Sequence, residues 1–109
     1  MAELPLAALL GTGARYTGEM SFDGRVRIDG TFTGRIFTED TLEIGESGVV
    51  DGQIDAATLI VAGVASGEIR VRGRLLLQPT GHLKGSVDAR VLEVRPGGRM
   101  DAHVRCGEP

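Results

Sequence analysis

The sequence predicts an all-β protein: a single-stranded, three-sided parallel β-helix (β-solenoid) of about six coils of 16–17 residues. Two interleaved repeats carry this prediction. The phrase glycine–x–apolar–x–glycine–x–apolar recurs from "GTFTGRI" (30–36) to "GRMDAHV" (98–104), and an apolar–x–apolar pair recurs from Val26–Ile28 to Leu92–Val94. Both repeats return after 15 to 18 residues, which is too short for a βαβ unit and fits one solenoid coil. Within each repeat, apolar residues alternate with the strand period of two.

Composition indicates one small domain with an aliphatic core. The 109 residues include 17 Gly, four Pro, no Trp, one Tyr and three Phe. The formal charge is -3, with acidic and basic residues interspersed, which argues against a general nucleic-acid binder. The single cysteine, Cys106, excludes an intramolecular disulfide and fits a reducing compartment. No apolar run approaches the roughly 20 residues of a membrane-spanning helix.

We expect three segments along the chain. Residues 1–12 form a flexible N-terminal segment, residues 13–105 the β-helix core and residues 106–109 a short C-terminal tail. The opening "MAELPLAALL" lacks the basic region of a secretory signal. Two alternatives stay open for it: a flap over the first coil, or a shallow membrane foot. The membrane contacts of such a foot would be Leu4, Leu6, Leu9 and Leu10.

Each predicted coil contains three short strands, for example Val26–Ile28, Thr31–Thr33 and Arg35–Phe37. Glycine suits the corners because it adopts positive φ without steric cost. Apolar positions should then stack inside the coil as ladders. One ladder is Phe32, Val50, Ala65, Leu83 and Met100, and another is Ile36, Ile54, Ile69, Val87 and Val104.

One predicted outward column has an apolar centre. The column reads Arg27, Glu43, Ile60, Leu76 and Glu93. Two explanations stay open for Ile60 and Leu76. They mark a lateral or partner contact, or they are β-forming residues that merely fill strand positions.

No combination of residues indicates catalysis. His82 and His103 fall in different outward columns without clustered carboxylates, and Cys106 has no histidine placed beside it. We therefore expect no enzyme activity, no catalytic residue, no metal, no cofactor and no nucleotide. One enzymatic alternative shares the fold type, because "IGESGVVDGQI" (44–54) resembles the repeat of left-handed β-helix acyltransferases of the hexapeptide-repeat class.

The predicted rod has apolar ends without an evident cap. An open coil exposes core side chains and unpaired backbone groups, which favours joining of one rod to the next. The expected polymerisation interface is formed by apolar residues of the first and last coils. These residues are Tyr16, Met20, Phe22, Leu92, Val94, Met100 and Val104.

The segment "LLGTGARYTGEMSFDGRVRIDGTFTGRI" (Leu9–Ile36), with the later phrases "DGQI" and "SGEI", resembles the bactofilin family over about residues 9–105. The resemblance implies a right-handed β-helix with short disordered termini. It also implies nucleotide-independent, non-polar filaments in which like ends meet. Such filaments lie in the cytoplasm, often on the inner face of the membrane, and scaffold cell-wall enzymes, cell-shape or chromosome-positioning machinery. The expected partners are other copies of the chain, the membrane and such cargo, without direct nucleic-acid binding.

Overall fold

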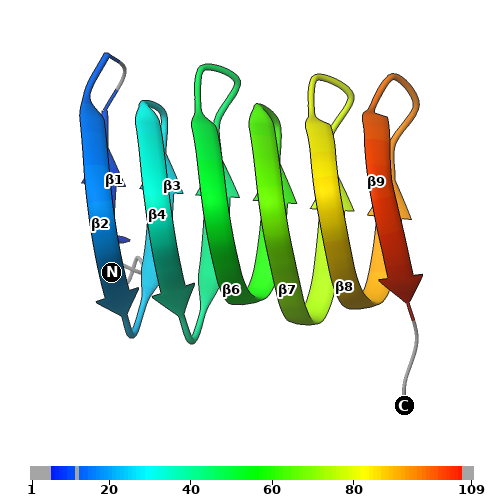
Figure 1. Ribbon diagram of the computed structural model, residues 1–109, viewed down its shortest axis with the longest axis horizontal. Helices are drawn as coiled ribbons and strands as arrows, with labels where there is room; N and C mark the ends of the chain where they lie inside the picture. Colours follow the sequence, from blue (N-terminus) through cyan, green and yellow to red (C-terminus); the bar gives the residue numbers. More distant parts are fainter. Residues whose placement is uncertain (1–5, 12, 107–109) are drawn as a thin grey trace, which may run out of the picture.

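A computed structural model describes residues 6–11 and 13–106. These residues form nine β-strands in one sheet that winds around a common axis (Figure 1). The strands are β1 (Leu6–Leu10), β2 (Arg15–Phe22), β3 (Arg25–Ile28), β4 (Thr31–Thr38), β5 (Thr41–Ile44), β6 (Val49–Val61), β7 (Val64–Leu77), β8 (His82–Val94) and β9 (Arg99–Cys106). No helix occurs within the described residues, in agreement with the predicted all-β class.

All strand pairs are parallel and form two stacks. The front stack contains β2, β4, β9 and the first parts of β6, β7 and β8. The rear stack contains β1, β3, β5 and the C-terminal parts of β6, β7 and β8. In Figure 1 the front strands run downward and the rear strands run upward while the coils advance to the right, so the solenoid is right-handed. This handedness agrees with the bactofilin resemblance and differs from the left-handed acyltransferase fold.

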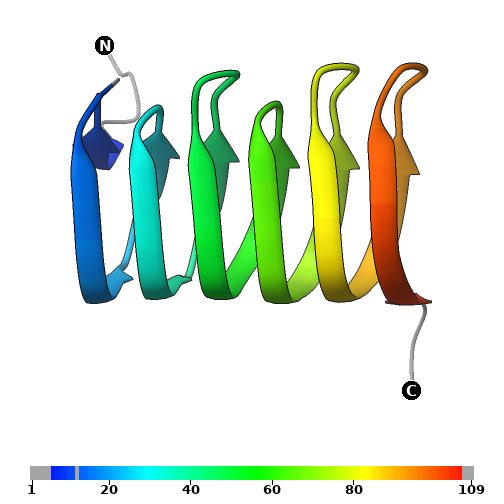
Figure 2. The same cartoon turned by 45° about the horizontal axis from the view of Figure 1, so that its top comes forward.

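The described residues complete five coils, slightly fewer than the predicted number of about six. The complete coils span residues 15–28, 31–44, 49–61, 64–77 and 82–94. A partial coil stands at each end, β1 at the N-terminal end and β9 at the C-terminal end (Figure 2). The difference arises because the last repeat, from Gly98, supplies only part of a coil. The longest dimension of the rod is 32 Å.

Glycines form the corner that divides every front strand except β9. In the second coil, residues 31–33 are the first side, residues 35–38 the second side and residues 41–44 the third side. Gly34 lies between the first two sides with φ 132, and Gly52 holds the equivalent place in the third coil with φ 133. A Cβ on Gly52 would collide with the carbonyl oxygen of Gly34. The corner therefore requires glycine both for its backbone angle and for the close stacking of coils.

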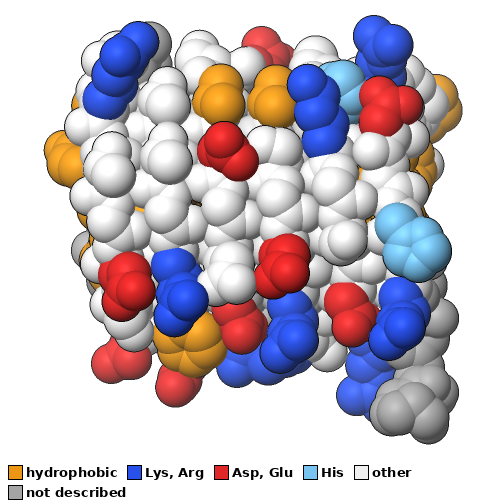
Figure 3. Space-filling model, in the orientation of Figure 1, with side chains coloured by type: hydrophobic (Ala, Val, Ile, Leu, Met, Phe, Trp, Pro, Cys, Tyr) orange, Lys and Arg blue, Asp and Glu red, His pale blue; other side chains and the backbone are white. Residues whose placement is uncertain are grey.

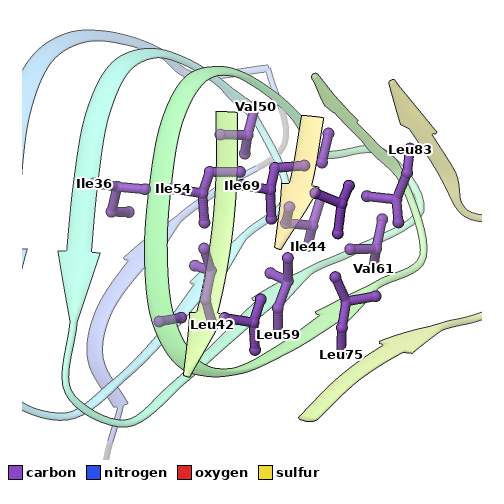
Figure 4. Packing of buried hydrophobic residues seen from close by; sticks show 14 of the residues in the cluster. Ile36, Leu42, Ile44, Val50, Ile54, Leu59, Val61, Ile69, Leu75 and Leu83 are labelled. Carbon is purple, nitrogen blue, oxygen red and sulfur yellow. The ribbon is translucent and has the colours of Figure 1, made fainter. Parts of the chain in front are cut away.

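The interior is filled by the predicted apolar ladders (Figure 4). Phe32, Val50, Ala65 and Leu83 align from coil to coil and are all 0% exposed. Two further ladders line the third side. They are Val26, Leu42, Leu59, Leu75 and Leu92, and Ile28, Ile44, Val61, Leu77 and Val94. Burial of each such side chain contributes about 1.5–3 kcal/mol to folding, so aliphatic stacking is the main source of stability.

Polar side chains fasten the corner between the second and third sides. The buried Thr38 hydroxyl donates a hydrogen bond to the Gly24 carbonyl, 2.6 Å away. Arg72, in the fourth coil, donates to the Thr38 carbonyl of the second coil at 2.6 Å and lies 3.4 Å from the Asp55 carboxylate of the third coil. Its guanidinium carbon also lies 5.1 Å from the centroid of the Phe37 ring. One arginine therefore ties three successive coils together.

Strand β1 changes the predicted segment boundary. Leu6–Leu10, expected within the flexible segment 1–12, pairs in parallel with β3 and places Leu10 opposite Ile28. The solenoid therefore begins before residue 13, and its first strand covers the third side of the first coil, as the flap alternative expects. The apolar run Leu6–Leu10 was not predicted as part of a coil because it contains no glycine phrase. Leu4 lies outside the described residues, and membrane contact through this segment stays a prediction.

Candidate polymerisation surfaces

Both ends of the rod are formed by strands with an open edge. Within the described residues, β2 pairs only with β4, and β9 pairs only with β8. Both end strands are eight residues long. Their outer backbone groups have no strand partner in the described part of the chain, and an open edge of this length is a template for another strand. We call the outer edges of β1 and β2 the N-terminal end surface. The C-terminal end surface is formed by β9 and residues 91–94.

The N-terminal end surface carries three of the predicted interface residues. Tyr16 stacks on Phe32 and is 41% exposed, whereas Phe32 is 0% exposed. Met20 stacks on Ile36, and Met20 and Phe22 are partly buried against the core. All three predicted residues are therefore the first rungs of ladders that continue through the solenoid.

The C-terminal end surface carries the other four predicted residues, which are the last rungs of the same kind of ladder. Val94 follows Leu77 and is 49% exposed, whereas Leu77 is 0% exposed. Leu92, Met100 and Val104 are partly buried against the core. The structure therefore places the seven predicted residues at the two ends, three on one and four on the other. Their contact with another copy of the chain stays a prediction.

Val91 is an apolar residue of this end that the sequence analysis missed. It is 47% exposed and follows Arg74 in an outward column of the third side. The column is otherwise polar, so the repeat gave no reason to expect an apolar residue there. Ala102 also departs from the pattern, because it replaces glycine at the last corner, opposite Gly85. The C-terminal end surface therefore contains more apolar residues than predicted.

A hydrogen bond between side chains joins the last partial coil to the coil before it. The His82 Nε2 lies 2.9 Å from an Asp101 carboxylate oxygen, across the pairing of β8 with β9. This hydrogen bond lowers the pKa of Asp101, and the nearby charges of Arg99 and Lys84 act in the same direction. Sequence reasoning placed His82 in solvent, because the contact runs diagonally between neighbouring columns and the ladder register does not encode it.

The third side contains both ion pairs and the predicted lateral residues. Arg25 lies 3.1 Å from Glu43 near the N-terminal end, and Arg74 lies 3.6 Å from Glu93 near the C-terminal end. Ile60 and Leu76 are aligned in adjacent coils between these pairs, and both are half-buried. By contrast, acidic and basic side chains are scattered over the front of the rod, together with a few hydrophobic side chains (Figure 3). The apolar centre of the third side is therefore flanked by charges that are already paired.

Among the described residues, no cluster of three or more His, Cys, Asp or Glu is arranged to hold a metal ion. Within residues 6–11 and 13–106, no helix is long and apolar enough to cross a bilayer.

The right-handed coil, its continuous ladders and its two open ends define a β-solenoid rod with surfaces for self-association. Comparisons with known proteins agree. The family profile described as "Bactofilin: Polymer-forming cytoskeletal" matches residues 8–105, and the chain belongs to this family. It is therefore a polymer-forming structural protein, and the acyltransferase alternative is not favoured.

Individual relatives support the family assignment. Bactofilin BacO of Myxococcus xanthus (strain DK1622) is 26% identical over 96 residues, which are 88% of this chain and 76% of the relative. A cryo-EM reconstruction of Thermus thermophilus bactofilin double helical filaments matches with a TM-score of 0.86 and 28% identity over 92% of this chain and 99% of that chain. The crystal structure of a point mutant of the same bactofilin matches with a TM-score of 0.78 and 30% identity over 84% of this chain and 100% of that chain.

Proposed function

We propose that this chain polymerises end to end, without nucleotide, into non-polar filaments in which like ends meet. The main support for the proposal is that the ladders of buried side chains end in exposed residues at both ends of the rod. Tyr16 is 41% exposed and Val94 is 49% exposed, while the rungs just inside them are fully buried. The similar Thermus thermophilus bactofilin forms double helical filaments, which supports assembly of this rod into filaments.

Joining two ends would pair the open strand edges and bury the exposed apolar side chains. The open edges of β2 and β9 would gain strand partners, and this pairing gives the junction its direction and register. The exposed apolar rungs would be removed from water, which supplies most of the affinity. Neither contribution requires nucleotide hydrolysis, so filaments should form with purified protein and buffer alone.

Variants that block one end test both polymerisation and its polarity. Tyr16→Arg places a charge on the N-terminal end surface, and Met100→Arg places one on the C-terminal end surface. If like ends meet, either variant should abolish long filaments and leave stable dimers joined through the unblocked end. Unlike-end joining would leave monomers with either variant. Sedimentation velocity distinguishes these outcomes, and circular dichroism checks that the β-structure is retained.

A matched control places the same charge away from the ends. Ser86→Arg adds an arginine on an exposed position of the second side, in the last complete coil. This variant should polymerise like the wild type in electron micrographs recorded without nucleotide. Long filaments from Met100→Arg would show that the C-terminal end surface is not the junction.

We also propose that the filaments act as a scaffold at the inner face of the cytoplasmic membrane, holding cell-envelope or positioning proteins. The support is the family resemblance and the leucine-rich start of the chain. Single apolar contacts are weak, but a filament presents many copies, and avidity then gives firm attachment. The test replaces Leu4 and Leu6 by Ser and measures co-sedimentation of filaments with phosphatidylglycerol–phosphatidylethanolamine vesicles. Equal co-sedimentation of wild type and variant would refute the membrane foot.

A further inference from the structure

The turns that connect the third side of one coil to the first side of the next differ in length. Residues 45–48 join β5 to β6 and residues 78–81 join β7 to β8, whereas residues 62–63 alone join β6 to β7. The two longer turns extend further from the strands than the short turn between them (Figure 1). Together they bound a depression of about 540 Å³, here called the notch. Its floor is Ile60 and Ala62, and its walls are residues 46–47 and 78–80.

Hydrogen bonds within the walls hold the notch in one shape. The Gly48 N–H donates to the Gly45 carbonyl at 2.8 Å, and the Gly81 N–H donates to the Gln78 carbonyl at 2.9 Å. The Thr80 hydroxyl donates to the Ala62 carbonyl at 2.7 Å, which ties one wall to the floor. The notch is therefore formed before any partner binds, as is usual for binding sites.

Apolar side chains form the floor of the notch and continue beyond both of its open ends. Ile60 lies beside Leu76 on the third side, and Val64 lies beside Val49 on the first side. Val49 is 36% exposed, and Ile60, Ala62, Val64 and Leu76 are half-buried. A second chain lying across the edge of the rod would remove this strip from water, which favours binding.

One carboxylate of the notch has no ion pair. Asp29 accepts a hydrogen bond from Arg27 at 2.9 Å, and Glu43 lies 3.1 Å from Arg25. Glu46 is exposed on the wall and forms no ion pair within the described part of the chain. Arg27, already bound to Asp29, is the one cation of the lining, and the opposite wall has no charged residue. A bound chain therefore gains from a positive charge at Glu46 and is opposed by a negative one.

The spacing of the coils limits what the notch accepts. Its walls belong to turns two coils apart, and neighbouring coils lie about 4.8 Å apart, so about 10 Å separates the wall backbones. An α-helix with its side chains is about 10–12 Å wide and does not fit once the wall side chains are included. A single extended chain fits, and every second side chain then faces the floor.

We infer that the notch binds an extended segment of a partner protein in which apolar residues alternate with lysine or arginine. The apolar side chains contact Ile60 and Ala62, and a cation pairs with Glu46. The inference rests on the proposed scaffold role, because it describes how a filament holds another protein. It is independent of polymerisation, since all residues of the notch belong to one chain. Filaments would present one notch per copy, so a multivalent partner binds more firmly than a single segment.

Two synthetic peptides test the predicted chemistry of the partner. One is a fluorescently labelled eight-residue peptide in which valine alternates with lysine, and the other alternates valine with glutamate. Fluorescence anisotropy measures their binding to the Met100→Arg variant, in which long filaments are not expected. The valine–lysine peptide should bind at least about tenfold more tightly than the valine–glutamate peptide, because only the lysines attract Glu46.

Three substitutions locate the binding. Ala62→Gln lengthens a side chain on the floor and should weaken binding of the valine–lysine peptide about tenfold, and Glu46→Gln should weaken it about threefold. Ala57→Gln is the matched control, because Ala57 is a half-buried alanine at another corner of the same coil. It should change the affinity by less than about twofold. Circular dichroism checks the fold, and Glu46→Gln, at an exposed turn, tests the notch even if Ala62→Gln fails to fold.

NMR of the same complex shows where the peptide lies. Amide resonances of residues 45–48, 60–64 and 78–81 should shift when the valine–lysine peptide is added. Shifts confined to β2 or β9 would show addition to an open strand edge and would overturn the inference. Equal binding of both peptides, no binding of the valine–lysine peptide, or binding unchanged by both Ala62→Gln and Glu46→Gln would also overturn it.

Failure of the proposed function gives a different result. A wild type that binds the valine–lysine peptide in the notch but forms no filaments would refute the polymerisation and support the binding site. Filaments that form normally but do not bind the peptide would refute the binding site alone.

Discussion

Tyr16 and Phe32 hold equivalent positions in consecutive coils, yet Tyr16 is 41% exposed and Phe32 is 0% exposed. Leu77 and Val94 repeat the contrast at the opposite end, with exposures of 0% and 49%. All four residues are apolar, so residue type does not explain the difference. Within the described residues, no further coil covers the outer residue. Middle coils are satisfied by their neighbours, whereas end coils would gain the same contacts if another chain packed against them.

The largest predicted effect compares one substitution at two corners. Gly52→Ala places a methyl group against the Gly34 carbonyl oxygen, while a Cβ on Gly18 meets nothing within 4 Å. Both glycines have strongly positive φ, 133 and 137, so both substitutions strain the backbone, at about 1–3 kcal/mol. Gly52→Ala should cost clearly more, because neighbouring coils must also separate. Urea denaturation in the Tyr16→Arg background, in which the N-terminal end stays open, measures both losses, and equal losses would contradict the difference between middle and end.

An intermediate effect is expected from the arginine that links three middle coils. Arg72→Met retains much of the side-chain length but removes the hydrogen bond to Thr38 and the ion pair with Asp55. We expect a loss of about 1–2 kcal/mol in the free energy of unfolding. Arg105→Met, an exposed position of the last partial coil, should change stability by less than about 0.5 kcal/mol. Similar losses in the free energy of unfolding for the two variants would show that Arg72 does not stabilise the stacking of the middle coils.

The smallest effect concerns attachment of the last partial coil. The hydrogen bond to His82 lowers the pKa of Asp101 from its ordinary value of 3.8. A lowered folded-state pKa means that the stabilisation is present above the ordinary value and is lost as pH falls through the lower one. Acidification below about pH 4 should therefore loosen β9 in the Met100→Arg background. Asp101→Asn should loosen it already at pH 7 and remove this acid transition.

Amide resonances of β9 followed by NMR during the titration would measure the effect. The middle strands β6 and β7 provide the internal control, because the contact involves β8 and β9 alone. Loosening of all strands together would indicate general acid unfolding, not a local change at the last coil.

The repeat specified most of the fold but little of its side-chain chemistry. Glycine and apolar spacing predicted the ladders, because a solenoid places equivalent residues directly above one another. The same spacing located Tyr16 and Val94 at the ends of their ladders. Arg72 was missed because an irregularity between Val71 and Arg74 interrupts the register at that corner. The His82–Asp101 contact was missed because it joins two columns, and column positions alone do not predict diagonal contacts.

The irregular ends of the chain were also harder to predict. Strand β1 lacks the glycine phrase. Its pairing with β3 also shifts in register between Leu6 and Ala8. A short apolar run of this kind has no periodic signal that would distinguish a covering strand from a membrane foot. Val91 was missed for the opposite reason, since the regular column around it predicted a polar residue.

Amide hydrogen exchange before and after assembly tests the central claim most directly. The claim is that β2 and β9 are open edges which gain partners when rods join. Backbone amides of β2 and β9 should exchange quickly in the dispersed protein and become strongly protected in filaments. Amides of β6 and β7 should be protected in both states. Filaments in which β2 and β9 exchange as fast as in the dispersed protein would contradict the account.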